Sequence, residues 1–547
     1  MTPDLPHYQP LWPETVLFWG AGATRALEIR TTAELSEAVF SLTAGEGNLA
    51  RRVTQQFSLA HFAVPVADLL AVLNGTNSRS ELERFFPGLT ERERRRRQAE
   101  LRRHYDFATL CDLVQICPGH TPAAFRLQDL FTLIDMHRDC RHGFYVSAFD
   151  GRGRQFVSPE KLLPARNALV MLINLLHYHD FSYCLDYGQT TFKQYAAFAR
   201  TLADMMLSEG ERLALGGRYD ERVYYLFSYA VISMNWDPLL LWLLANAFDA
   251  ADEGAEQRPR QKLFHDYGHL IGLRSLHGDN PAAWYPVNEA VAQRVNNPSF
   301  GGNIRLRLGK YYFPHGCSSW RECPSCGKLT LYLGNEYIPH SPSLYPPPLA
   351  GMLSAMWRRA QSGQEKSAHA QGMYDALHCV HCGALTEARH IPLVMQSGFR
   401  DHRPAFLEEI HHEIRICLEN AHHVLFMGYT LPPDDIMYRS LLAARQKRGT
   451  DGQPFCSVVV GADESAPDAW LTGRELAEYL ASHEGTAFFH TVQAAQAIFP
   501  SEKVRGYARG IPAVFLDDSG HVTLETVADL LYPGGLPGRL PDQRKMS

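Results

Sequence analysis

Residues 15–24 read TVLFWGAGAT, a short apolar run that leads directly into a Gly-x-Gly turn. The apolar run is typical of a buried strand, and the residues beyond the turn show helical spacing. A strand that ends in Gly-x-Gly before a helix opens many nucleotide-binding α/β folds, because glycine lets the backbone approach a phosphate. The third glycine of the full pattern is missing, so an ordinary tight turn explains this stretch equally well on its own.

Three later apolar runs end in the same manner. Tyr229–Met234 is followed by Asn235-Trp236-Asp237, His423–Met427 by Gly428-Tyr429-Thr430, and Ser457–Val460 by Gly461-Ala462-Asp463. Parallel strands of an open sheet gather their carboxyl ends at one edge, so these residues are expected to share a cleft there. Asp237 can instead cap the helix that begins near Pro238, which leaves Asn235 as the stronger candidate.

A second pattern joins a histidine to a cysteine knuckle. His315 precedes Cys323 and Cys326, which form a Cys-x-x-Cys-Gly motif, and Cys379 with Cys382 forms another. Two such pairs are typical of a structural Zn²⁺ site with four thiolate ligands, and such a site has no open position for chemistry. The spacer between the pairs is long and contains a proline-rich stretch, Pro339–Pro348, so the metal-binding unit carries an insertion. Taken alone, His315 is explained as a strand-end histidine bonded to backbone.

The chain of 547 residues is too long for one simple core. Apolar residues at helical spacing recur between residues 32 and 226. We therefore expect an α/β protein with a Rossmann-like parallel sheet, a small zinc-ribbon domain and a large α-helical insertion. The expected boundaries are 1–31, 227–310 and 388–500 for the sheet domain, 32–226 for the insertion, 311–387 for the zinc ribbon, and 501–547 for a C-terminal extension with a flexible end.

Composition and charge exclude several classes of protein. The net charge of −6 argues against direct nucleic-acid binding. The basic run from Arg92 to Arg103 can hold phosphates or an acidic partner, but its interleaved glutamates favour a solvated helix face. His265 and His269 can share a helix face, yet no acidic signature completes a zinc site there.

The apolar window 224–248 is broken at its centre by polar residues and proline, and the N-terminus lacks a secretory pattern, so we expect a cytoplasmic protein that does not enter membranes.

In their order along the chain, these motifs resemble those of the sirtuin (silent-information-regulator) superfamily. The resemblance is carried by residues 20–24, Asn235-Trp236-Asp237, His315-Gly316, the two cysteine pairs and residues 428–432, and it covers roughly half of the chain. It implies a sirtuin/DHS-like NAD-binding fold, NAD⁺ as substrate, and chemistry at the nicotinamide–ribose bond. It further implies that His315 is a general base and that Asn235 lies beside the nicotinamide ribose. The residues implied to contact NAD⁺ are Gly20, Ala21, Gly22, Ala23, Thr24, Asn235, Asp237, Gly428, Tyr429, Thr430 and Gly461.

The sequence also departs from the protein deacetylases of that family. Thr24 is not followed by a Gly-Ile-Pro-Asp-Phe-Arg-like segment, Gly461 stands where an asparagine is usual, and the spacer before Asn235 is far longer. In these respects the chain is more similar to sirtuin-like NADases of bacterial anti-phage defence. That resemblance implies hydrolysis of NAD⁺ to nicotinamide and ADP-ribose, or to cyclic ADP-ribose. The alternatives are an NAD-dependent protein-lysine deacylase and a non-catalytic NAD sensor. The helical insertion is expected to support a homo-oligomer or a hetero-complex.

Overall fold

The computed structural model describes residues 12–86, 88–147, 153–184, 190–253, 260–269, 271–275, 282–284, 287–301, 304–323, 325–333, 379, 381–383, 392–395, 405–446 and 455–533. Four expectations lie outside these residues. They are the first eleven residues of the expected sheet domain, the proline-rich insertion between the cysteine pairs, the part of the sheet domain at 388–391, and the end of the chain after 533.

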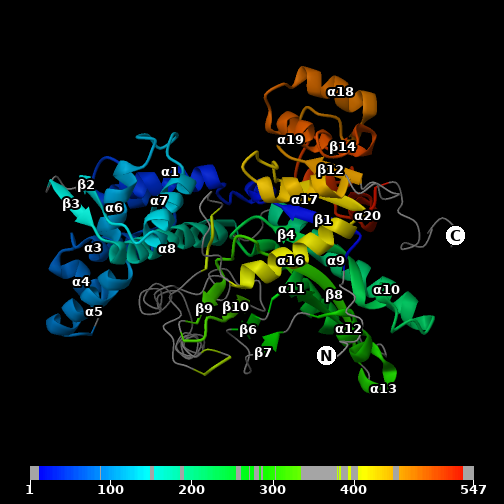
Figure 1. Cartoon of the computed structure of the whole chain (residues 1–547), viewed down its shortest axis with the longest axis horizontal. Coiled ribbons are helices and arrows are strands. Elements are labelled where there is room, and N and C mark those ends of the chain that lie inside the picture. The colour runs from blue at the N-terminus through cyan, green and yellow to red at the C-terminus, as the bar shows by residue number, and fades with distance from the viewer. Residues whose placement is uncertain are drawn as a thin grey trace.

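The centre of the molecule is an eight-stranded, mostly parallel sheet in a mixed α/β fold (Figure 1). Its strands are β1 (Thr15–Trp19), β4 (Leu226–Ser233), β5 (Arg260–Asp266), β8 (Ile304–Tyr312), β11 (His423–Met427), β12 (Phe455–Val459), β13 (Leu471–Thr472) and β14 (Val504–Gly506). The four apolar runs of the sequence form β1, β4, β11 and β12. Their side chains are buried on both sides of the sheet, which explains why they are continuously apolar.

The strand order is β13-β14-β12-β11-β1-β4-β8-β5. β1 therefore lies between β4 and β11, which are parallel to it and continue the sheet in opposite directions. The inner six strands follow the order 3-2-1-4-5-6 of doubly wound sheets, in which ligands bind at the carboxyl ends where the order reverses. That point lies between the ends of β1 and β11.

A helical lobe is inserted between β1 and β4 (blue to cyan in Figure 1). It contains α1 (Thr32–Thr43), α2 (Leu49–Gln56), α3 (Ala60–Asn74), α4 (Arg79–Phe85), α5 (Glu91–His104), α6 (Phe107–Ile116), α7 (Leu127–Asp139) and α8 (Pro159–Cys184), with a hairpin of β2 (Phe144–Ser147) and β3 (Arg154–Val157). The basic run lies on α5, where Arg95, Arg96 and Arg97 pair with glutamates of the same helix. These exposed pairs match the solvated helix face that the sequence favours.

The remaining helices that precede β12 lie around the central sheet. They are α9 (Thr190–Leu215), α10 (Arg222–Tyr225), α11 (Leu239–Glu253), α12 (Glu289–Asn296), α13 (Pro298–Gly301), α16 (Ala405–Asn420) and α17 (Ile436–Gln446). α9 packs against α11 and β5, so the segment from 190 to 226 is part of the sheet layers rather than of the lobe. The insertion that we expected to extend to residue 226 therefore includes two helices, α9 and α10, that pack with the sheet.

The chain after residue 460 adds α18 (Gly473–Ser482), α19 (Ala487–Gln496) and α20 (Leu524–Leu531). Short 3₁₀ segments in the described residues lie at Ala21–Ala23, Arg25–Leu27, Ser501–Lys503 and Ala513–Phe515. β14 pairs with β12 in parallel, and α20 packs on α9. The segment from 501 that we expected to be an extension thus contributes strand β14 to the central sheet. It packs with the sheet domain as far as the structure describes it, to residue 533. Within the described residues, no helix has the length and hydropathy that a membrane span requires.

A second, four-stranded sheet forms the small domain. Its order is β7 (Ala282–Trp284), β6 (Ile271–Ser275), β10 (Leu329–Leu333) and β9 (Trp320–Glu322). The apolar runs of the sequence do not mark β5, β6 and β7. β5 reads as polar because Lys262, His265 and Asp266 lie in it, yet Asp266 is buried against Lys310 of β8, whose ammonium also pairs with Glu413. His265 therefore lies on a strand, where the expected helix face with His269 does not form.

Candidate functional site

A pocket of about 580 Å³ opens at the carboxyl edge of the central sheet. Residues from the turns after β1, β4, β8, β11 and β12 line it together. Of the residues predicted from the sequence, the lining contains Gly20, Ala21, Gly22, Asn235, Asp237, His315, Gly428, Tyr429, Thr430 and Gly461. Ala23 and Thr24 are buried behind the turn and do not line the pocket.

The glycine turns after β1 and β11 interlock. The Gly20 amide donates to Met427 O at 2.9 Å, and the Gly22 amide donates to Gly428 O at 3.0 Å. A Cβ on Gly20 would lie 2.4 Å from Gly428 O, so only glycine permits this approach. The amides of Ala23 and Thr24 also donate to backbone carbonyls within the turn. Four amides of this turn therefore already donate to protein carbonyls. The glycines allow the ends of β1 and β11 to approach each other closely.

Gly428 provides a test of this interlock. Its φ is +62°, and an added Cβ would lie 1.9 Å from the Ala23 amide nitrogen. We expect Gly428→Ala to lower the free energy of unfolding by more than about 2 kcal/mol, because backbone must move as well as adopt a strained φ. Gly461→Ala is the matched control, since Gly461 has φ +83° with no atom near its Cβ position, and should cost only about 1 kcal/mol. Equal losses in urea unfolding would show that the interlock is unimportant.

The turn after β4 brings two buried polar side chains to the pocket. Asn235 and Asp237 are 6% and 4% exposed. The Leu239 amide donates to Asp237 Oδ1 at 3.1 Å, so Asp237 does cap α11, as the alternative interpretation held. Burial raises the pKa of Asp237 to about 6, and the hydrogen bonds from the Leu239 amide and the Asn235 side chain oppose this rise.

The raised pKa of Asp237 predicts a pH-dependent stability. Its folded pKa of about 6 exceeds the ordinary 3.8, so the buried acid stabilises the fold below pH 4, and that stability is lost as the pH rises through 6. The loss amounts to about 3 kcal/mol. Asp237→Asn keeps a capping oxygen but does not titrate. Urea unfolding should show the variant gaining about 3 kcal/mol on the wild type between pH 4 and pH 7; a difference that does not change with pH would contradict this.

His315 follows β8 on a loop that two other segments hold. Gly316, with φ +76°, turns the chain, and a Cβ there would lie 1.8 Å from Pro392 O. The Val394 amide donates to His315 O at 2.9 Å, and the Ser318 amide donates to Trp236 O at 2.8 Å. The loop of His315 is thus tied to the turn of Asn235, which places both candidate residues at the same pocket.

The helical lobe closes the pocket with residues that the sequence did not reveal. Arg30, Thr31 and the first turn of α1 line it, together with Gln128 of α7 and His177 of α8. The Arg30 amide and guanidinium both bond to Asp180 of α8. Thr31 and Glu34 form a capping box at the start of α1. That Thr-x-x-Glu signature was visible in the sequence and would have marked a helix N-terminus beside the glycine turn.

Two further groups define the electrostatics of the pocket. Burial lowers the pKa of His177 to about 4, so this imidazole is neutral at pH 7, and its Nδ1 lies 3.5 Å from Ser318 Oγ. The Tyr429 hydroxyl donates to Asp435, and burial together with this carboxylate raises the pKa of Tyr429 well above its usual value. The pocket therefore combines the neutral His177 and Tyr429 side chains with the carboxyl groups of Asp237 and Asp435, and with Arg30 on the lobe side.

The lobe also reaches the backbone beside His315. Arg166 of α8 is buried, and its Nη2 donates to Leu393 O at 2.7 Å. Its Nε donates to Asp135 Oδ1 at 2.9 Å, which fixes the guanidinium. Because Val394 bonds to His315 O, a single buried arginine connects α8 to the loop of the candidate base.

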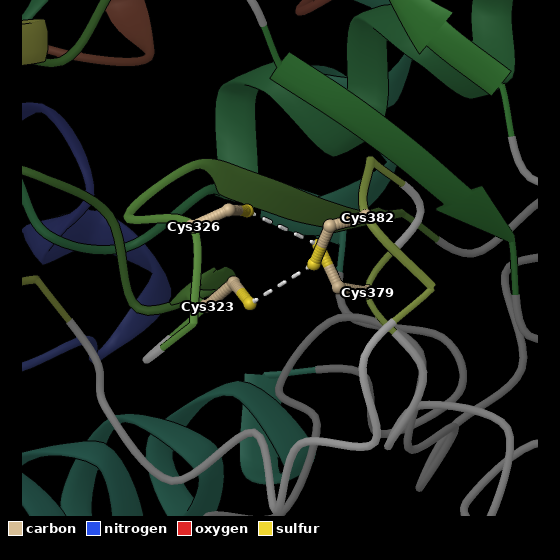
Figure 2. Close-up of side chains that lie close together, drawn as sticks. All are labelled: Cys323, Cys326, Cys379 and Cys382. Carbon is tan, nitrogen blue, oxygen red and sulfur yellow. Dashed lines mark hydrogen bonds between the residues drawn. The ribbon is translucent and has the colours of Figure 1, made fainter.

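The four cysteines that the sequence predicts as metal ligands gather at one point of the small domain. All four Sγ atoms lie within 4.8 Å of one another, and Figure 2 shows the sulfurs turned toward a common centre. The distances are 3.9 Å between Cys323 and Cys382 and 3.6 Å between Cys326 and Cys379. A tetrahedral site with Zn–S bonds of about 2.3 Å requires sulfurs about 3.8 Å apart. The cluster therefore fits a zinc-like metal ion.

The knuckle geometry explains the glycine after each pair. Gly327 and Gly383 have φ of +67° and +70°, and their amides donate to the carbonyls of Cys323 and Cys379. These turns direct the His381 amide to Cys379 Sγ at 3.4 Å. Amides that point at the sulfurs stabilise thiolates, which is the ligand form.

No protein-family model matches the chain, and a search of curated proteins finds none that is similar to it. The functional assignment therefore depends on the residues and their arrangement.

Proposed function

We propose that this protein is a sirtuin-like NAD⁺ glycohydrolase that cleaves the nicotinamide–ribose bond. The observation that carries the proposal is the meeting of Asn235, His315 and the two glycine turns around one pocket at the point where the strand order reverses. Nucleotides bind at that point in doubly wound sheets. A volume of about 580 Å³ is in the range of small-molecule and cofactor sites.

Cleavage of the nicotinamide–ribose bond requires the protein to position NAD⁺ and water and to supply one proton acceptor. As the N-glycosidic bond breaks, nicotinamide leaves with the bonding electron pair and the ribose carbon becomes positive. Water then bonds to that carbon. His315 accepts a proton from this water or from a ribose hydroxyl, which a neutral imidazole does near pH 7. Asn235 orients the ribose or the water without adding charge, and an ionised Asp237 beside it favours the developing positive charge.

Binding of the pyrophosphate is assigned to the lobe side of the pocket. Four amides of the glycine turn already donate to protein carbonyls, which leaves little for a phosphate there. The first turn of α1 lines the same pocket and offers the positive end of a helix dipole, and Arg30 lies beside it with its guanidinium held by Asp180 and the Gln56 carbonyl. The proposed pose therefore places nicotinamide near His315 and the phosphates near Arg30.

The four-cysteine cluster has a structural role in this proposal. Bound Zn²⁺ would hold Cys323 and Cys326 to Cys379 and Cys382, and four sulfur ligands leave no position for substrate. Strand β9 of the small sheet begins only five residues after His315. Its integrity therefore bears on the position of the candidate base.

The direct test is to incubate the purified protein with NAD⁺ and to follow nicotinamide by liquid chromatography. Release of nicotinamide with ADP-ribose or its cyclic form supports the proposal. Cleavage that occurs only in step with deacylation of an acetyl-lysine peptide would support a deacylase instead. Tight NAD⁺ binding without any cleavage, including in cells challenged with phage, would support a sensor.

We further propose that the enzyme acts as an anti-phage effector that removes cellular NAD⁺, with the helical lobe as the surface for a partner or for other copies of the chain. Cells that express it should lose NAD⁺ after phage infection, and cells that express His315→Ala should not. Light scattering of the purified protein measures the oligomeric state.

A further inference from the structure

The helical lobe contains a second pocket, separate from the site described above. It has a volume of about 780 Å³ and lies among α2, α3, α5 and α6. Its lining includes three basic side chains, Arg52, Arg102 and Lys161, and the first residues of α2. It shares no lining residue with the pocket at the sheet edge.

Arg52 is the unusual residue of this pocket. Its side chain is only 9% exposed, and its Nη1 donates to Leu42 O at 3.0 Å. Its Nε has no hydrogen-bond partner, and no carboxylate pairs with the guanidinium, within the part of the chain that the structure describes. A buried guanidinium without a counter-charge is costly, and such groups in native proteins usually meet an ion or ligand.

The three acidic side chains of the pocket, Glu81, Asp106 and Asp112, keep their negative charge but already accept hydrogen bonds from protein donors. Asp106 accepts from the Thr109 amide at 2.9 Å and from its hydroxyl at 2.6 Å, which caps α6. Asp112 accepts from Gln155. Glu81 accepts from the Ser78 amide in the capping box of α4. These carboxylates are therefore committed to local contacts.

The other basic groups are not committed in this way. Arg102 and Lys161 are exposed at the pocket, and neither forms an ion pair with any residue that the structure describes. The N-terminus of α2, capped by Asn48, adds the positive end of a helix dipole. Three basic groups and a helix N-terminus thus surround one cavity.

We propose that this pocket binds a small phosphorylated compound of sugar-phosphate size. Guanidinium groups bind phosphate oxygens through paired hydrogen bonds, and burial of Arg52 strengthens such a bond. None of the lining residues is aromatic, so the pocket offers no surface for stacking a nucleobase. The polar lining, with Asn48, Asn74 and Thr76, suits sugar hydroxyls instead. This inference does not depend on the proposed NAD⁺ chemistry.

Titration calorimetry of the full chain with ribose 5-phosphate, pyrophosphate and unphosphorylated ribose tests the inference. Ribose 5-phosphate or pyrophosphate should bind and ribose should not. Arg102→Gln and Lys161→Gln, both exposed and compatible with folding, should each weaken binding at least about tenfold. Arg103→Gln is the matched control, because Arg103 is exposed on the same helix and does not line the pocket.

Two results would overturn the inference. One is that neither phosphorylated probe binds. The other is binding that Arg102→Gln and Lys161→Gln leave unchanged, since the phosphate would then lie elsewhere, for example near Arg30. Arg52→Gln completes the set, and its folding is checked by circular dichroism before its affinity is compared.

Discussion

His315→Ala should lower the rate of nicotinamide release by about 100-fold to 10,000-fold, the range that general acid–base groups contribute. The physical reason is that no other proton acceptor is proposed for the ribose hydroxyl or water. Because His315 is expected to act in the transition state rather than in binding, kcat should fall while KM for NAD⁺ changes little. Steady-state kinetics by chromatography measures both values.

Two further variants accompany His315→Ala, one outside the pocket and one inside it. His521→Ala removes an exposed histidine that does not line the pocket and should leave the rate unchanged. Asn235→Ala should reduce kcat as well, since the ribose or water is no longer oriented. A His315→Ala enzyme that retains the full rate would reject His315 as the base, whether or not the protein cleaves NAD⁺ by another route.

Loss of the metal should unfold the small domain. Structural Zn²⁺ sites in peptides contribute about 10–16 kcal/mol at pH 7, far more than the stability of a four-stranded sheet of this size. Cys379→Ser should therefore reduce bound zinc from one ion per chain to none and give an additional unfolding transition at low temperature. Elemental analysis and scanning calorimetry record the two effects.

The exposed Cys140 is the matched control for this substitution, because it lies on the lobe outside the cluster. Cys140→Ser should keep one zinc and the wild-type transition. If Cys379→Ser keeps its metal and its melting profile, the four sulfurs are not a metal site. Under the proposed function, Cys379→Ser should also lose activity, since the loop of His315 leads directly into this domain.

The strands of the central sheet could be predicted where burial on both faces makes the sequence continuously apolar. β1, β4, β11 and β12 are of this kind. β5 could not, because its buried polar side chains become acceptable only through partners distant in sequence. Asp266 and Lys310 neutralise each other, 44 residues apart, and the sequence contains no local sign of that pairing.

The same distinction applies to the candidate site. Asn235, His315 and the glycines follow directly after strands, so their gathering at one edge follows from the topology of parallel sheets. His177, Gln128 and Arg30 come from the lobe, and their place at the pocket depends on how that lobe folds back. The amides of Gly20 and Gly22 are not free for a phosphate, because the end of β11 approaches closely enough to accept hydrogen bonds from them.

The contact from Arg166 to Leu393 has a consequence for how this protein is divided. A segment inserted between two strands is often regarded as an accessory that arose later and can be removed. Here the lobe supplies one wall of the pocket and, through Arg166, a fixed point beside His315. The sheet with its glycine turns is therefore only half of the candidate site, and a shortened chain that joins β1 directly to β4 would lack the other half.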